Sequence, residues 1–125
     1  GSYRFMAPEV FRHENYTETV DIYSFAMIFF YMLDGNPPWP NENGVAAVRM
    51  AALDGDRPIL PRNWDARFQT LLQECWDENP KTRPPFKKIL SVLNDYARDM
   101  PKTTMHRTLS TMSVSKDTGC SCAVM

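Results

Sequence analysis

The sequence predicts a mainly α-helical domain of about four helices joined by long connections, followed by a flexible tail. Within residues 1–100, apolar side chains recur at intervals of three and four, which is the spacing of one helix face, and no alternating run typical of a strand is found. The pairs Asp34-Gly35 and Asp54-Gly55 interrupt these segments, as helix ends require. Composition changes at residue 101, which separates the predicted domain, 1–100, from the predicted tail, 101–125.

The first predicted helix runs from Val20 to Leu33. Thr19 is the expected N-cap, and Asp34-Gly35 followed by Pro37-Pro38 ends the helix. Because its apolar residues cover every face, we expect this helix to be enclosed by protein as the central pillar of the domain. Those residues are Ile22, Phe25, Met27, Ile28, Phe29, Phe30, Met32 and Leu33.

Three further helices follow from the same periodicity. The second spans 44–53, and its weak apolar stripe consists of Val45, Val48 and Met50. The third spans 64–77, and its stripe consists of Phe68, Leu71, Leu72, Cys75 and Trp76. The last spans 85–100, and its inward residues are expected to be Ile89, Leu90, Val92, Leu93 and Tyr96.

The tail differs from the domain in its chemistry. Residues 101–125 contain nine Ser or Thr, three basic residues, one acidic residue and no aromatic residue. Such a segment cannot bury enough apolar surface to offset the entropy lost on ordering. We therefore predict a disordered tail.

Charge and cysteine usage exclude several classes of function. The net charge of −1 provides no electrostatic reason to expect nucleic acid as a partner. The three cysteines form neither a paired disulfide framework nor a CxxC half-site, and neither histidine lies near a cysteine pair, so no metal site is predicted. With no secretory signal and no apolar run long enough to cross a bilayer, the expected location is a reducing, cytoplasmic compartment.

Four motifs occur in collinear order. The triplet Ala7-Pro8-Glu9 comes first, then the segment 20–25 (VDIYSF), then Pro37-Pro38-Trp39, and finally the segment 75–86 (CWDENPKTRPPF). Together they resemble the distal helical half of a protein kinase C-lobe, beginning at the end of the activation segment. The Met-Ala-Pro-Glu wording is more similar to tyrosine-kinase-like serine/threonine kinases, such as the Raf and mixed-lineage groups, than to true tyrosine kinases.

The resemblance implies structural roles for two acids and an arginine. Glu9 is expected to pair with Arg83 and so clamp the activation segment to the helices, whereas the alternative is a surface ion pair of little energetic weight. Asp21 matches an aspartate that, in the family, accepts hydrogen bonds from the backbone of the catalytic loop. This chain does not contain a catalytic loop. The alternative role of Asp21 is to complement the dipole at the start of the helix.

The resemblance also implies that residues 1–6 belong to the loop that accepts the substrate residue following the phosphorylation site. The substrate-binding candidates are Ser2, Tyr3, Arg4 and Met6, with Ser2 a candidate provided that Gly1-Ser2 is not an expression remnant. Trp39, Trp64 and Trp76 are expected to be packing residues rather than ligand platforms.

The chain lacks the residues that phosphoryl transfer requires. Its glycines never form GxGxxG, and Asp-Phe-Gly is absent. The pair His106-Arg107 is similar to the start of a catalytic-loop motif, but no aspartate follows it directly. We predict no catalytic residue and no cofactor in this chain, with Mg-ATP implied for an intact parent kinase acting on Ser/Thr of protein substrates. The expected partners are the rest of the kinase domain and those substrates. The alternative is a pseudokinase or scaffold binding module, or a lipid-anchored docking fragment.

The last four residues, Cys122-Ala123-Val124-Met125, match a prenylation box in which the terminal Met favours farnesyl. One lipid binds membranes only marginally, so Cys120 is a candidate for a second lipid, palmitate. The prediction is membrane association through Cys122, and it requires Met125 to be the natural C-terminus. The alternative is a chance match on a disordered end.

Overall fold

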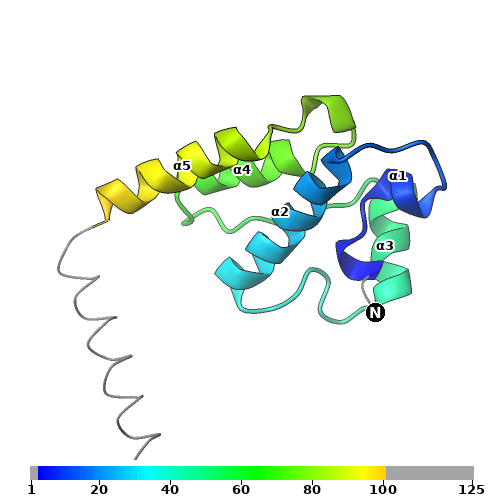
Figure 1. Cartoon of the computed structure of the whole chain (residues 1–125). Coiled ribbons are helices and arrows are strands. Elements are labelled where there is room, and N and C mark those ends of the chain that lie inside the picture. The colour runs from blue at the N-terminus through cyan, green and yellow to red at the C-terminus, as the bar shows by residue number, and fades with distance from the viewer. Residues whose placement is uncertain (1–2, 101–125) are drawn as a thin grey trace, which may run out of the picture. The chain divides into compact units, whose positions relative to one another are not determined.

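The computed structural model describes residues 3–100, and all of its regular structure is helical (Figure 1). No strand occurs within this range, so the predicted mainly α class is confirmed. The elements in chain order are η1 (Tyr3–Phe5), α1 (Pro8–Phe11), α2 (Thr19–Asp34), α3 (Gly44–Leu53), α4 (Ala66–Cys75), η2 (Pro80–Thr82) and α5 (Phe86–Asp99). The four predicted helices are α2, α3, α4 and α5, whereas the three short elements were not predicted.

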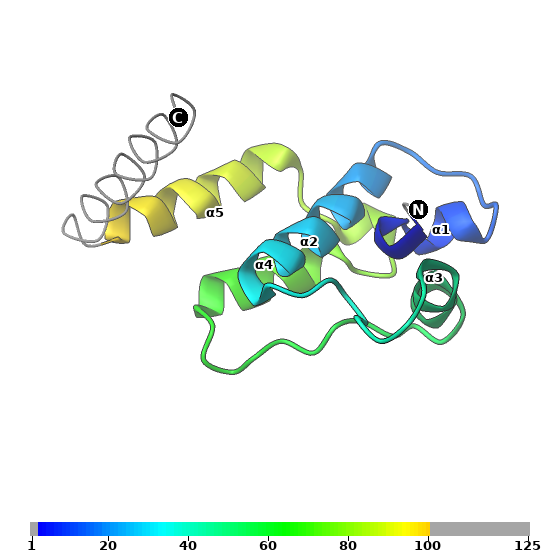
Figure 2. The same cartoon turned by 90° about the horizontal axis from the view of Figure 1, so that it is seen from below.

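Helix α2 forms the pillar of the domain, as predicted, but it is covered on one side only. It contacts η1, α4 and η2, and the two views in Figures 1 and 2 both show α4 running alongside it. The prediction that every face is enclosed is wrong for the described residues. Ile28 and Tyr31 are exposed, and Met32 is 74% exposed. Within residues 3–100, the ring of Phe5 stacks on that of Tyr31, but Met32 stays largely exposed.

The ends of α2 follow local chemistry. The predicted N-cap is wrong by one position, because Thr19 is the first helical residue and Glu18 is the N-cap, without a side-chain capping bond. Backbone N–H groups of Val20 and Asp21 donate instead to the carbonyls of Thr17 and Glu18. At the other end Gly35 adopts φ +86° and donates its N–H to the Tyr31 carbonyl at 2.9 Å, a left-handed cap that favours glycine.

Helix α3 has the predicted bounds, but of its predicted stripe only Val48 is buried. The Asn43 side chain caps it by accepting from the Ala46 N–H at 2.8 Å. Its buried residues are Ala47, Val48, Ala51 and Ala52, while Val45 is exposed. Small side chains let α3 approach α1 and η1 closely, which both views of the molecule show (Figures 1 and 2).

Helix α4 is shorter than predicted at both ends. Asp65 accepts the Arg67 N–H at 2.9 Å and so starts the helix after Trp64, and Trp76 is its C-cap. The predicted stripe is confirmed, because its five members are all buried: Phe68, Leu71, Leu72, Cys75 and Trp76.

Helix α5 begins one residue after and ends one residue before the predicted range. Ile89 is buried, but Leu90, which was predicted to face inward, is exposed. The chain divides into two compact units between Val92 and Leu93, inside this helix. The predicted domain boundary at residue 101 lies at the edge of the described range and stays a prediction.

Aromatic side chains join α2 to its neighbours. The ring of Phe29 meets that of Phe68 edge-on, with centroids 5.2 Å apart, and Phe25 meets Phe86 in the same way at 5.9 Å. Phe30 contacts two tryptophans, with centroids 5.6 Å from Trp64 and 6.3 Å from Trp76. Each such pair is worth about 0.5 to 1.5 kcal/mol beyond the area that it buries. Of the helices within residues 3–100, none has the length and apolar character needed to cross a membrane.

Candidate functional site

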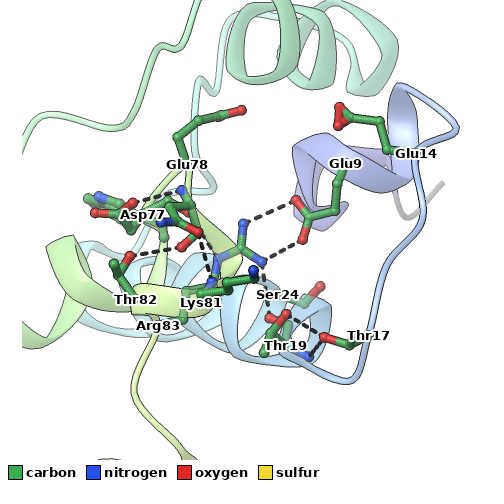
Figure 3. Close-up of polar contacts among 12 residues, drawn as sticks. Glu9, Glu14, Thr17, Thr19, Ser24, Asp77, Glu78, Lys81, Thr82 and Arg83 are labelled. Atoms are coloured by element: carbon green, nitrogen blue, oxygen red, sulfur yellow. Dashed lines mark hydrogen bonds and ion pairs between the residues drawn. The ribbon is translucent and has the colours of Figure 1, made fainter.

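The predicted pair of Glu9 and Arg83 meets inside the molecule (Figure 3). Pro8 begins α1 and places Glu9 in its first turn, while Arg83 follows η2 in an extended conformation. The two nitrogens Nη1 and Nη2 of Arg83 donate to Oε1 and Oε2 of Glu9 at 2.6 and 3.1 Å. Because Glu9 is 3% exposed and Arg83 is 5% exposed, the alternative of a surface ion pair does not describe this contact.

Arg83 also bonds the backbone of two other segments. Its Nε donates to the Asp77 carbonyl at 3.0 Å, and Nη1 donates to the Thr19 carbonyl at 3.1 Å. One guanidinium therefore joins α1, the start of α2 and the loop after α4. Burial by itself would raise the pKa of the Glu9 carboxyl, but the hydrogen bond from Arg83 and the charges of Arg83 and Arg12 outweigh it. The pKa lies below its ordinary value, so the pair is ionised.

Tyr23 lies between two guanidinium groups. The carbons Cζ of Arg57 and Arg83 each lie 5.2 Å from the centroid of its ring, within the range of a cation–π contact. The ring is fully buried, and burial raises the pKa of Tyr23 to about 12. Its hydroxyl makes no hydrogen bond to any residue within 3–100.

This orphan hydroxyl leads to a stability prediction. Replacing Tyr23 with phenylalanine should raise the free energy of unfolding by about 1 to 2 kcal/mol, because an unmade buried hydrogen bond is costly. Urea denaturation followed by circular dichroism measures the change. The matched control is Tyr16→Phe, at an exposed tyrosine, where no change is expected. A loss of stability in Tyr23→Phe would show that the hydroxyl has a partner.

A second ionic cluster holds the other side of α1. Glu78 accepts from Nη2 of Arg12 at 2.7 Å and from Nη2 of Arg57 at 3.1 Å. Arg12 also pairs with Glu14 and donates to the Ala52 carbonyl at 2.7 Å. The pKa of Arg12 is raised, chiefly by its hydrogen bond with Glu14. The end of α1 is thereby tied to the end of α3 and to the loop after α4.

Neither Arg12 nor Arg57 was predicted from the sequence. Each lies outside the helices that hydrophobic periodicity identifies. Arg57 donates to the carbonyls of Ala51 and Trp76, which no side-chain pattern reveals. The one feature of the sequence that marks Arg57 is its position two residues after Gly55, which adopts φ +72° at a turn.

The structure describes three of the four substrate-loop candidates, since Ser2 lies outside the described residues. The Arg4 guanidinium donates to the carbonyls of Pro38, Trp39 and Glu42 at 2.5 to 2.6 Å and so holds the loop between α2 and α3. Tyr3 and Met6 line a surface hollow of about 610 Å³ whose other walls come from α1 and the segment after it. The contacts of all four residues with a substrate stay a prediction.

The loop is also fixed to the pillar. Ser24 donates its hydroxyl to the Phe5 carbonyl at 2.7 Å, and the ring of Phe5 stacks on that of Tyr31 with centroids 6.5 Å apart. Three independent contacts, from Arg4, Ser24 and Glu9, therefore hold residues 3–9 against the helices. Such a segment presents its side chains in one arrangement.

The remaining structural candidates lie in different environments. Trp76 is buried, as its packing role requires, and Trp39 is half-buried with φ +50°. Asp21 is exposed in the first turn of α2, and its side chain makes no hydrogen bond with residues 3–100. This position suits interaction with the helix dipole, and the bond from Asp21 to a catalytic loop stays a prediction.

The described residues offer no donor set for a metal. No group of three or more His, Cys, Asp or Glu side chains within residues 3–100 is arranged to bind an ion. Burial raises the pKa of Cys75 to about 12, which keeps its thiol protonated. Cys120 and Cys122, the predicted lipidation sites, lie outside the described residues.

Comparisons with known proteins match most of the chain. A family described as protein tyrosine and serine/threonine kinase matches residues 1–93. Among curated relatives, the Arabidopsis thaliana serine/threonine-protein kinase VIK is 40% identical over 102 residues, which are 81% of this chain and 23% of that protein. The A. thaliana serine/threonine-protein kinase STY17 is 32% identical, over 86% of this chain and 19% of that protein. The A. thaliana serine/threonine/tyrosine-protein kinase HT1 is 36% identical, over 77% of this chain and 25% of that protein. The chain therefore spans a quarter or less of each relative.

Proposed function

The chain belongs to the protein tyrosine and serine/threonine kinase family, and on that premise we propose that it is the distal part of a catalytic domain that phosphorylates proteins. The parent protein would transfer the γ-phosphate of ATP to serine or threonine side chains. Two of the relatives compared above are named serine/threonine kinases, and the third is named a serine/threonine/tyrosine kinase. Protein substrates and the preceding part of the kinase domain would be its partners.

The observation that carries this proposal is the buried pair of Glu9 and Arg83. It anchors the end of the segment 3–9, whose start carries the substrate-loop candidates, while Arg4 and Ser24 hold that segment at two further points. A peptide substrate meets a surface that is already ordered, and preorganisation lowers the entropic cost of aligning the acceptor hydroxyl. In this role the chain positions a substrate and performs none of the chemistry.

The test is a transfer assay on the full-length product of the gene that encodes this chain. The protein is incubated with ATP labelled at the γ-phosphate and a mixture of Ser, Thr and Tyr peptides, and the labelled amino acids are identified. Label on serine or threonine supports the proposal. Absence of transfer by a folded protein that still binds its partners would support the pseudokinase or scaffold alternative instead.

The 125-residue chain alone should not bind Mg-ATP. It has no glycine-rich phosphate loop and no Asp-Phe-Gly, and residues 3–100 contain no cluster of three or more acidic, His or Cys side chains placed to bind an ion. Isothermal titration of Mg-ATP into the chain is expected to give only heats of dilution, whereas the full-length protein should give a saturable curve. Saturable binding heat from the isolated chain would contradict the proposal that nucleotide binding requires other parts of the parent protein.

The C-terminal box leads to a separate prediction about membranes. A reporter carrying residues 101–125 should become membrane-bound in cells that contain farnesyltransferase, because the Cys122 thiol is the alkylation site. The variant Cys122→Ser should release the reporter, and fractionation by centrifugation measures its distribution. The matched control, Ser121→Ala, should leave it bound. A reporter that is soluble from the start, or that stays bound in Cys122→Ser, would contradict the prediction.

A further inference from the structure

A groove of about 430 Å³ lies apart from the substrate loop. It is formed by the end of α2, the loop that follows α2 and the segment that follows α3. The residues that line it are Phe30, Asp34, Pro37, Trp39, Pro40, Asp56, Arg57, Pro58 and Ile59. None of the substrate-loop candidates, and neither Glu9 nor Arg83, belongs to this set.

Most of the lining is apolar. The aromatic side chains of Phe30 and Trp39 and three prolines contribute to the groove, and Ile59 at its edge is 90% exposed. Prolines lose little entropy on binding because their backbone is already restricted. A single exposed isoleucine is ordinary, but one beside an aromatic groove gives a ligand additional apolar surface to cover.

The unpaired charge of the groove is negative. Asp34 and Asp56 are both exposed, and neither carboxylate has a hydrogen bond or an ion pair with residues 3–100. Arg57, the cation in the lining, is already paired with Glu78 and bonded to three backbone carbonyls. Two free carboxylates therefore flank an apolar surface, and a positively charged ligand complements them.

The wall formed by Trp39 is held in place at a conformational cost. Its φ of +50° is in the left-handed region, which is unfavourable for a residue other than glycine. Its carbonyl accepts from Arg4 at 2.6 Å and from the Glu42 N–H at 3.0 Å, which fixes the loop on both sides of the tryptophan. The wall is therefore set before any ligand arrives.

We propose that this groove is a docking site for a peptide segment of another protein, with aliphatic side chains flanked by lysine or arginine. The aliphatic side chains pack against Trp39 and Ile59, over the floor formed by Phe30. The flanking cations pair with Asp34 and Asp56. This recognition is separate from phosphoryl transfer, because no group proposed to position a substrate takes part.

The first test compares three synthetic peptides binding to the full 125-residue chain. The probe is a fluorescein-labelled peptide with a Leu-Pro-Leu centre and two arginines on each side, and binding is followed by anisotropy. In one comparison peptide glutamates replace the arginines, and in the other serines replace the leucines. The probe is expected to bind more tightly than both. Equal affinity for the glutamate peptide, or no binding of the probe at about 1 mM, would overturn the proposal.

The second test uses variants at exposed positions, which leave the fold intact. Ile59→Ser should weaken probe binding about tenfold, because it removes most of one aliphatic contact. Leu53→Ser is the matched control, since Leu53 is 59% exposed and lies outside the groove. Equal effects of the two variants would overturn the proposal, and circular dichroism verifies that both are folded.

The charge contribution is tested in the same assay at low salt. Asp34→Asn and Asp56→Asn should each weaken binding about threefold, as expected for the loss of an exposed ion pair. Asp54→Asn, at an exposed aspartate outside the groove, should leave the affinity unchanged. Self-association of the chain that Ile59→Ser abolishes, seen by sedimentation, would assign the groove to a second copy and overturn the proposal.

Discussion

Replacing Arg83 with alanine is expected to lower the free energy of unfolding by about 3 to 5 kcal/mol, because it leaves the Glu9 carboxylate buried without its partner. The change also removes donors from the carbonyls of Thr19 and Asp77. Since domains of this size are stable by about 5 to 15 kcal/mol, the loss would consume much of the total. Urea denaturation followed by far-ultraviolet circular dichroism measures it, with an osmolyte added if the variant is partly unfolded in buffer.

The matched control is Arg98→Ala. Arg98 pairs with Asp95 on the surface of α5, and 75% of its side chain is exposed. The expected loss is within about 0.5 kcal/mol. The double variant Glu9→Leu with Arg83→Met should recover part of the stability lost in Arg83→Ala, because it removes both charges together. Equal losses at Arg83 and Arg98 would mean that the clamp contributes nothing beyond a surface pair.

The second large effect is expected at Phe30. Replacing it with alanine should cost about 3 to 5 kcal/mol, since a buried ring is lost and its cavity can close only partly. Phe30 contacts Trp64 and Trp76, so the emission of these tryptophans should also shift to longer wavelength as water reaches them. Thermal unfolding and fluorescence are recorded on the same sample.

The comparison for Phe30 is Phe86→Ala. The Phe86 ring meets Phe25 edge-on but is half exposed, so its removal should cost about 1 kcal/mol. A loss at Phe86 as large as that at Phe30 would show that α2 is not the centre of the packing. An unchanged tryptophan spectrum in Phe30→Ala would contradict the contacts described for Trp64 and Trp76.

The sequence predicted those features that depend on pattern. Helix α4 shows the predicted buried stripe because Phe68, Leu71 and Trp76 are large and recur at helical spacing. Glu9 and Arg83 were predicted to meet because each belongs to a motif of a recognised family. Physical reasoning alone would not have paired two side chains so distant in the sequence.

Features that depend on neighbours escaped prediction. The buried face of α3 consists largely of alanines, whose weak hydrophobicity does not compete with that of the exposed Val45 in a periodicity argument. Leu90 was assigned inward by its spacing alone and is exposed. Arg12 and Arg57 find their partners among backbone carbonyls and Glu78, which only the folded chain brings together.

Glu9 and Arg83 are 74 positions apart, which has a consequence for the chain as it leaves the ribosome. Closing a loop of that length costs about 4 kcal/mol of chain entropy, so the pair forms after the intervening helices have shortened the distance. Until the arginine emerges, the carboxylate stays hydrated in water. A translation product that stops before Arg83 can neither complete the pair nor bury the acid cheaply. The late arginine thus makes synthesis beyond residue 83 a condition of a stable fold.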